Sequence, residues 1–179
     1  LWLLKKDKKK KLHMRQKLPR GNIYNELIKN YSVGILTAVI RRKFYLKLEK
    51  KFDERFTIIE DFDFFLRLSK LCFFESIQEP LAYYRLHGGN LSTVMKGKEI
   101  EEFELWLKEN KTDLSLTDVQ NLQKNIDNRK FVNSKIDGHY RKCLSMLINP
   151  KINIFSIKNL IIFFSPIILL KKILWYHQD

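Results

Sequence analysis

The sequence predicts an α/β domain in the first half of the chain, followed by helices. Three short runs in that half, residues 34–40, 73–77 and 81–87, are apolar and partly β-branched or aromatic, which is typical of strands. Between the first two, residues 58–72 carry apolar side chains at helical spacing. From residue 98 to residue 147 the apolar spacing is helical throughout. We therefore expect strands and helices over 1–95 and helices alone afterwards.

The composition is that of a folded, basic protein. Of the 179 residues, 45% are hydrophobic and 30% are charged, which excludes a disordered chain. The net charge of +14 favours an anionic partner, namely nucleic acid, anionic lipid or a phosphorylated substrate, without choosing among them. The two cysteines, Cys72 and Cys143, lie in apolar helical patterns without metal-ligand spacing. We expect core thiols in a reducing compartment.

The N-terminal segment is basic and has no signal-peptide pattern. The chain begins with Leu1, and six lysines lie between Lys5 and Lys11. No apolar segment with a cleavage site follows them. We expect the chain to be a piece of a longer protein or a truncated frame. The lysine run is interpreted as a solvated segment, with contact to anionic lipid or phosphate as the alternative.

Two helices and one strand are expected before residue 52. Asn22 follows a Pro-Arg-Gly turn signal and can cap a helix that ends near Asn30. The apolar face of this helix consists of Ile23, Leu27 and Ile28. Residues 34–40 suit a buried strand, residues 41–51 a basic helix, and residues 52–56 a loop held by two aromatic residues.

Three carboxylates mark the start of the next helix. Glu60, Asp61 and Asp63 fall at or just before its N-terminus, where the helix dipole and free backbone N–H groups favour negative charge. The apolar face that follows consists of Phe64, Phe65, Leu68, Leu71 and Cys72. One interpretation is structural, because acidic residues start helices well and Asp63 can pair with Arg67 one turn later.

A second polar cluster follows the last expected strand. Arg85 and His87 are two residues apart, so they lie on one face of an extended segment. A Gly-Gly pair comes directly afterwards and allows backbone to approach a ligand closely. The structural alternatives are an ion pair of Arg85 with Glu75 or Glu79, and a turn role for His87.

Helices are expected over most of the second half. Residues 98–110 form one helix, and another starts at Leu116-Thr117-Asp118 with Thr117 as its N-cap. One or two helices then run to Leu147, with Gly138 as a possible break, and Asn149-Pro150 ends the region.

The tail from residue 152 to residue 176 is the most apolar part of the chain. Its apolar run from Leu160 to Leu170 is interrupted by Ser165-Pro166 and is shorter than the roughly 18 uncharged residues that a membrane span needs. One alternative is an amphipathic helix at a membrane surface, anchored by lysines, Trp175 and Tyr176. The other is a helix that packs in a core or against a partner.

Taken in order, the polar motifs of the first half resemble a known enzyme family. The set begins with Phe52-Asp53-Glu54 and continues with Glu60-Asp61-x-Asp63-x-x-Leu66-Arg67. Glu79-Pro80-Leu81-x-x-Tyr84-Arg85-x-His87-x-x-Asn90-x-Ser92 follows. This set is similar to the C-terminal half of the catalytic domain of family 2 glycosyltransferases. The resemblance covers roughly residues 19–92 and implies a partial GT-A (Rossmann-like) domain over 1–95. The residues that follow predict a helical extension over 96–150 and an apolar, basic helical tail over 151–179.

The resemblance implies sugar transfer from a nucleotide-diphosphate donor to an acceptor hydroxyl, with a role for each of five residues. Asp61 would take the proton of the attacking hydroxyl, and Glu60 would orient the acceptor or support Asp61. Arg85 and His87 would stabilise the departing diphosphate, and Ser92 would bind phosphate or its neighbouring loop. His87 is also a candidate ligand of the divalent metal, Mg²⁺ or Mn²⁺, expected for the full-length enzyme.

The donor-binding half of such an enzyme is not recognised here. About 60 residues precede the acidic cluster, and they lack repeated strand–helix units. We therefore expect a fragment, inactive alone, of an enzyme that makes cell-surface polysaccharide or lipopolysaccharide. It would act on a glycan or lipid-linked acceptor, in the cytoplasm or at the inner face of an anionic membrane. The alternatives are a non-catalytic remnant or interaction half that needs a partner chain and, ranked last, a basic nucleic-acid-binding module, for which no motif is present.

Overall fold

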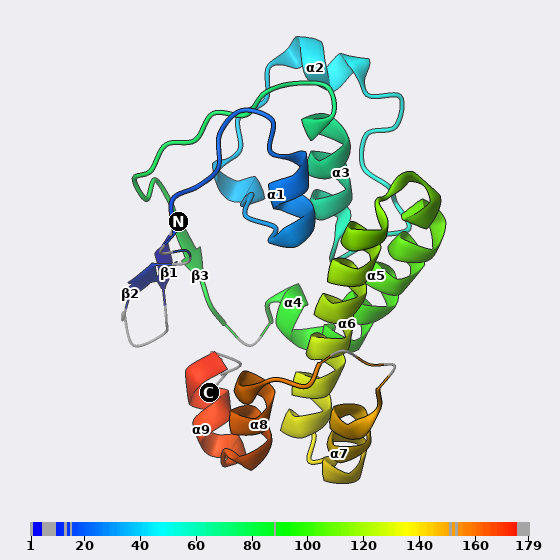
Figure 1. Ribbon diagram of the computed structural model, residues 1–179. Coiled ribbons are helices and arrows are strands. Elements are labelled where there is room, and N and C mark those ends of the chain that lie inside the picture. Colours follow the sequence, from blue (N-terminus) through cyan, green and yellow to red (C-terminus); the bar gives the residue numbers. More distant parts are fainter. Residues whose placement is uncertain are drawn as a thin grey trace. The chain divides into compact units, whose positions relative to one another are not determined.

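The structure is a computed structural model that describes residues 2–4, 10–12, 14, 16–87, 89–150, 152 and 154–174. The chain divides into two compact units, Leu1–Leu91 and Ser92–Asp179. Helices make up most of the regular structure in the described residues (Figure 1). The lysine run at 5–11 and the tail residues Trp175 and Tyr176 fall largely or wholly outside them.

The first unit contradicts the expected α/β fold class. Its sheet has three strands of three residues each, in the order β2-β1-β3, with β1 antiparallel to β2 and parallel to β3. These strands are β1 (Trp2–Leu4), β2 (Lys10–Leu12) and β3 (Tyr83–Arg85). The helices are α1 (Tyr24–Lys29), α2 (Arg42–Lys47) and α3 (Glu60–Ser69), with a 3-10 turn, η1 (Ile35–Thr37). The described residues form no repeated strand–helix units, so the prediction of a partial GT-A (Rossmann-like) domain is wrong.

Helix α3 forms the apolar centre of the first unit. Phe64, Phe65 and Leu68 are buried, as their spacing predicts, and α1 packs against α3. The α1 face contributes Ile23, Leu27 and Ile28, all buried. Leu71 is 43% exposed, against expectation, because α3 ends at Ser69 and the helical spacing no longer applies.

Two of the three expected strands do not form. In the segment 34–40, Ile35 and Leu36 belong to η1 and are more than half exposed, and Val39 is 98% exposed. In the segment 73–77, only Phe74 pairs, through two backbone hydrogen bonds with Gly21 of 2.7 and 2.8 Å. A strand needs a neighbour for its backbone groups, and neither segment finds a ladder among the described residues.

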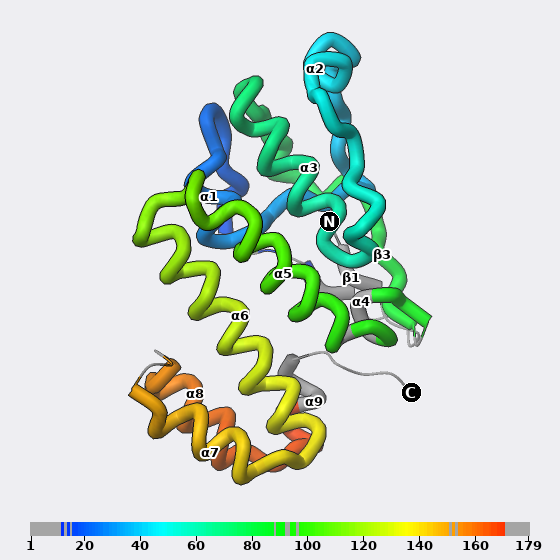
Figure 2. The backbone as a smooth tube through the Cα atoms, turned by 90° about the vertical axis from the view of Figure 1, so that its right-hand side faces the viewer, coloured from blue at the N-terminus to red at the C-terminus, as the bar shows by residue number. Residues whose placement is uncertain are grey.

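The second unit consists of helices. They are α5 (Lys96–Asn110), α6 (Leu116–Ile136), α7 (Tyr140–Ile148), α8 (Ile157–Phe164) and α9 (Ile167–Leu174), with a 3-10 turn, η2 (Lys111–Asp113), after α5. The short helix α4 (Leu91–Val94) crosses the boundary between the units. Helices α5 and α6 lie side by side (Figure 2). The break at Gly138 is confirmed, but the N-cap of α6 is Ser115, whose hydroxyl accepts the Asp118 N–H at 3.1 Å, and not Thr117.

One apolar cluster joins four helices of the second unit. It consists of Phe131, Cys143, Met146, Leu147, Ile154, Ile162 and Leu170. The cluster draws on residues of both expected segments, 96–150 and 151–179, so the extension and the tail share a core. Cys143 is fully buried as predicted, whereas Cys72 is partly exposed; neither forms a disulfide. No described helix combines the length and the apolarity needed to cross a membrane.

Candidate functional site

Glu60 and Asp61 occupy the first turn of α3, as predicted. The residue before the helix is Ile59, which has no polar side chain to cap the free N–H groups of this turn. The Asp61 carboxylate accepts the Phe62 N–H at 2.7 Å. The helix dipole favours negative charge at this position, and the short hydrogen bond fixes the direction of the carboxylate.

Asp61 is a partly buried carboxyl whose pKa is raised above its ordinary value. Burial is the main cause, since it disfavours the charged form. The hydrogen bond from the Phe62 N–H and the interaction with the Tyr31 hydroxyl lower the pKa and offset only part of this effect. A carboxyl with a raised pKa binds a proton more strongly than an exposed aspartate, which is the direction of shift that strengthens a general base.

Tyr31 is the partner of Asp61 that the sequence motifs did not identify. Its buried hydroxyl interacts with Asp61 without reaching the geometry of a standard hydrogen bond. Burial raises the pKa of Tyr31 far above its ordinary value, and the negative charges of Asp61 and Glu60 raise it further, so this hydroxyl stays protonated. The Tyr31 ring packs edge-to-face on buried Phe62, with ring centroids 5.6 Å apart. No sequence signal marks Tyr31, because it lies just beyond α1 and outside the motifs.

Asp63 and Arg67 hold α3 to the loop that precedes it. The Arg67 guanidinium donates to the Asp63 carboxylate at 2.7 Å, so the predicted ion pair one turn apart is confirmed. The same guanidinium donates to the backbone carbonyl oxygens of Lys50 and Lys51. Arg67 therefore joins a carboxylate of the first turn to the loop that leads into the helix.

Asp53 stabilises that loop through two ion pairs. Its buried carboxylate pairs with Arg55 at 2.8 Å and with Lys50 at 2.5 Å. The hydrogen bond from Arg55, together with that from Lys50, holds the pKa of Asp53 well below its usual range, against the opposing effect of burial. The Phe52 ring stacks on Phe64 with a centroid distance of 4.4 Å. The loop thus has a fixed conformation at the base of α3.

Arg85 and His87 lie at and just beyond the end of β3. Both are exposed, in the alternating pattern expected for one face of an extended segment. Asn90 stabilises the turn that follows: its side-chain oxygen accepts the His87 N–H, and its amide donates to the Tyr84 hydroxyl at 3.1 Å and to the Arg85 carbonyl at 3.2 Å. Asn90, which the motif included without a role, is therefore a turn-stabilising residue.

Among the described residues, the structure shows no bond between the acidic residues of α3 and the pair Arg85 and His87. Within the described part of the chain, no hydrogen bond or ion pair connects Arg85 or His87 to Asp61. Arg85 also does not pair with the acidic residues proposed as its alternative partners, and Glu75 instead lies 3.8 Å from Arg20. Ser92 lies in α4, and its side chain is outside the described atoms.

His87 has a role in the turn that follows β3. The His87 Nδ1 atom accepts the Gly89 N–H at 3.2 Å, which is the turn role that the sequence left open. Across the described residues, no three His, Cys, Asp or Glu side chains are grouped so that they could share a metal ion. The divalent metal stays a prediction for a longer protein.

The described residues define a predominantly helical chain of two units, with an acidic helix N-terminus as its candidate site. No protein-family model matches this chain, and comparisons with curated proteins and with solved structures gave no match. The candidate function therefore rests on the residues themselves.

Proposed function

We propose that this chain supplies the acceptor-side carboxylate of a glycosyltransferase that uses a nucleotide-diphosphate sugar. The observation that carries the proposal is Asp61, a partly buried carboxyl with a raised pKa at the N-terminus of α3. Its carboxylate accepts the Phe62 N–H and interacts with the protonated hydroxyl of Tyr31. The ordered motif from Glu60 to Ser92 supports the same assignment.

The proposed reaction needs one base and one stabilised leaving group. The acceptor oxygen attacks the anomeric carbon of the donor sugar and forms the new C–O bond. The bond from that carbon to the diphosphate oxygen breaks, and its electron pair leaves with the diphosphate. Asp61 takes the proton of the acceptor hydroxyl, and Glu60, its neighbour in the first turn, orients the acceptor.

Arg85 and His87 are the cations assigned to the leaving group. Both are exposed at the end of β3, and the structure gives the Arg85 side chain no acidic partner among the described residues. A guanidinium is suited to binding a diphosphate through paired hydrogen bonds. The proposal assigns nucleotide binding to protein outside this chain, since the described residues contain no extended sheet to hold a base.

The test uses the native protein in its full length, supplied with a panel of nucleoside-diphosphate sugars. Release of nucleoside diphosphate is measured for the native protein, for Asp61→Asn and for Asp113→Asn. The last variant makes the same chemical change at an exposed carboxylate of η2. We expect Asp61→Asn to lower kcat by about 100-fold or more, and Asp113→Asn to leave it within a factor of about two.

Two results would overturn this assignment. One is the absence of turnover with every donor of the panel. The other is an Asp61→Asn variant that is as active as the native protein, since the proton acceptor would then lie elsewhere.

A second candidate function is favoured by one observation in the first unit. An apolar groove of about 810 Å³ is lined by parts of both segments that were expected to be strands. Exposed side chains on these segments include Val39, Phe73 and Ile77. Segments with strand-like sequence and no neighbouring strand are suited to pairing with another chain. On this interpretation the chain is an interaction half that needs a partner polypeptide.

Light scattering on the purified chain separates the second candidate from the first. In the absence of the partner polypeptide, we expect a second copy of the chain to occupy the groove. The native chain then self-associates, and Phe73→Glu abolishes the association while Leu116→Glu does not. Phe73 and Leu116 are both highly exposed, at 80% and 83%, so the two variants are matched. A native chain that is monomeric at all concentrations would exclude self-pairing through this groove.

A further inference from the structure

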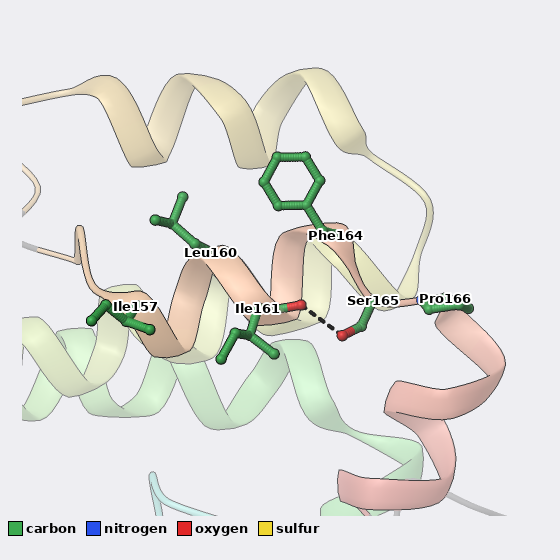
Figure 3. A pocket seen from close by; sticks show the side chains of 6 residues that line it. All are labelled: Ile157, Leu160, Ile161, Phe164, Ser165 and Pro166. Carbon is green, nitrogen blue, oxygen red and sulfur yellow. Dashed lines mark hydrogen bonds between the residues drawn. The ribbon is translucent and has the colours of Figure 1, made fainter.

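The turn between α8 and α9 carries an exposed apolar face. Ile157, Ile161 and Phe164 follow at spacings of four and three residues along α8 and are 78%, 61% and 78% exposed. Ile168, on α9, is 84% exposed. With Leu160, Ser165 and Pro166, the α8 residues line an open depression of about 450 Å³ (Figure 3). Large apolar side chains gathered in this way mark an interaction surface.

Contacts on the opposite face of α8 and α9 keep these apolar side chains exposed. Ile162 and Leu170 are buried in the apolar core of the second unit. The buried Asn159 amide donates to the Ile154 carbonyl at 2.6 Å and to the Asn128 side chain at 2.7 Å. Lys135 donates to the Phe163 carbonyl at 2.6 Å. Helix α8 therefore cannot rotate its apolar face inward without losing these bonds.

Charge is segregated along the second unit. Residues 92–137 contain eight Lys and Arg and nine Asp and Glu, a net charge of 8 − 9 = −1. Residues 138–178 contain six basic residues and no acidic residue, a net charge of +6. The six are Arg141, Lys142, Lys151, Lys158, Lys171 and Lys172. Of these, Lys158 is exposed on α8 itself, and Arg141 and Lys142 are exposed on α7, which packs against α8.

We propose that the apolar face of α8 and α9 lies on the surface of an anionic lipid bilayer. Apolar side chains insert at the boundary between headgroups and acyl chains, and lysines and arginines beside them contact anionic headgroups. Residues 138–178, which include this face, carry six basic and no acidic residues and provide that charge complementarity. Each helix has eight residues, and Pro166 separates them, so they lie along the surface and do not cross it.

Vesicle sedimentation tests the proposal on the chain of 179 residues. Vesicles of phosphatidylcholine alone are compared with vesicles that contain roughly one third phosphatidylglycerol. We expect binding to the anionic vesicles, weakened by salt at about 0.5 M, and little binding to the neutral ones. The double variant Ile161→Glu, Phe164→Glu is expected to lose about tenfold or more in binding, because it places carboxylates on the apolar face.

The control is Leu116→Glu, at an 83% exposed apolar residue at the start of α6, which is expected to leave vesicle binding unchanged. Circular dichroism establishes that each variant keeps its helix content. The charge contribution is tested separately with Lys158→Glu, which is expected to weaken binding to anionic vesicles alone.

Three results would overturn the proposal. The first is no sedimentation with anionic vesicles, and the second is binding that Leu116→Glu and the α8 double variant reduce equally. The third is a native chain that does not bind vesicles but forms a dimer that the double variant converts to monomer, which would assign the face to a second copy of the chain.

Discussion

At the residue scale, the charged form of Asp61 destabilises the fold, and the same form is the one that can accept a proton. Its carboxylate is held in place by the Phe62 N–H, yet burial raises its pKa, so the charged form is disfavoured in the folded chain. A residue that destabilises the fold in its active ionisation state is typical of a functional site. Tyr31 moderates this cost, since its hydroxyl favours the charged carboxylate.

The raised pKa of Asp61 predicts how stability depends on pH. Below the unfolded-state pKa, the carboxyl is protonated in both the folded and the unfolded state, so it does not lower the free energy of unfolding. As pH rises toward the higher pKa of the folded state, the unfolded chain loses its proton first, so stability falls and stays lower above that pKa. We expect Asp61→Asn to raise the unfolding midpoint at neutral pH and to flatten this decline, as measured by thermal denaturation between pH 3 and pH 8. A lower midpoint at pH 7 would contradict the prediction.

At the element scale, Arg67 links helix α3 to the loop before it. Arg67→Met removes the ion pair with Asp63 and the two bonds to the carbonyl oxygens of Lys50 and Lys51. Because Asp63 is left buried without its guanidinium, we expect a loss of about 2 kcal/mol in urea denaturation. Limited proteolysis is expected to cleave first within residues 48–56. Arg42→Met, at an exposed position of α2, serves as the control and is expected to change stability by less than about 0.5 kcal/mol.

Gly138 determines where α6 ends and α7 begins. Its φ of +79° lies in the left-handed region, where a side chain is strained although nothing would obstruct a Cβ atom. We expect Gly138→Ala to cost about 1 kcal/mol. Gly97, within α5, also has open space but no such backbone angle, so Gly97→Ala is expected to be neutral or stabilising by up to about 1 kcal/mol. Equal effects of the two substitutions would refute the backbone explanation.

The elements that the sequence predicts well are those with local causes. Helix α3 follows from acidic residues before an apolar face, and the α6–α7 break from a single glycine. The prediction of strands at 34–40 and 73–77 is wrong, because strand formation depends on pairing with a segment distant in the sequence. The periodicity of a single segment does not reveal that pairing. The prediction that Thr117 caps α6 is wrong, because Ser115, two residues earlier, is an equally good capping residue and takes that position. The role of Tyr31 is also not predictable from local sequence, since only the tertiary structure brings Tyr31 to Asp61.

At the scale of the whole molecule, each unit has its own apolar core. In the second unit, Phe131 is fully buried among residues of α7, α8 and α9. We expect Phe131→Ala to lower the free energy of unfolding of this unit by about 3–5 kcal/mol, because a large cavity is left in a packed core. Leu116→Ala, at an 83% exposed position, is expected to stay within about 0.5 kcal/mol. Urea denaturation followed by circular dichroism measures both.

The net charge of +14 is likewise a property of the whole molecule, but its distribution is informative. Residues 138–178 hold six basic and no acidic residues, while residues 92–137 are nearly balanced. Overall charge alone fits any polyanion. The coincidence of a basic sequence with an exposed apolar face favours a lipid surface for the second unit.

The measurement that tests the central claim most directly is the pH dependence of sugar-donor turnover by the native protein. If Asp61 is the base, kcat/KM falls on the acidic side with an apparent pKa above that of an ordinary aspartate. Tyr31→Phe moves this limb to higher pH, because it removes an interaction that lowers the pKa of Asp61. A limb at the ordinary carboxyl pKa, unmoved in Tyr31→Phe, would contradict the assignment of Asp61 as the catalytic base.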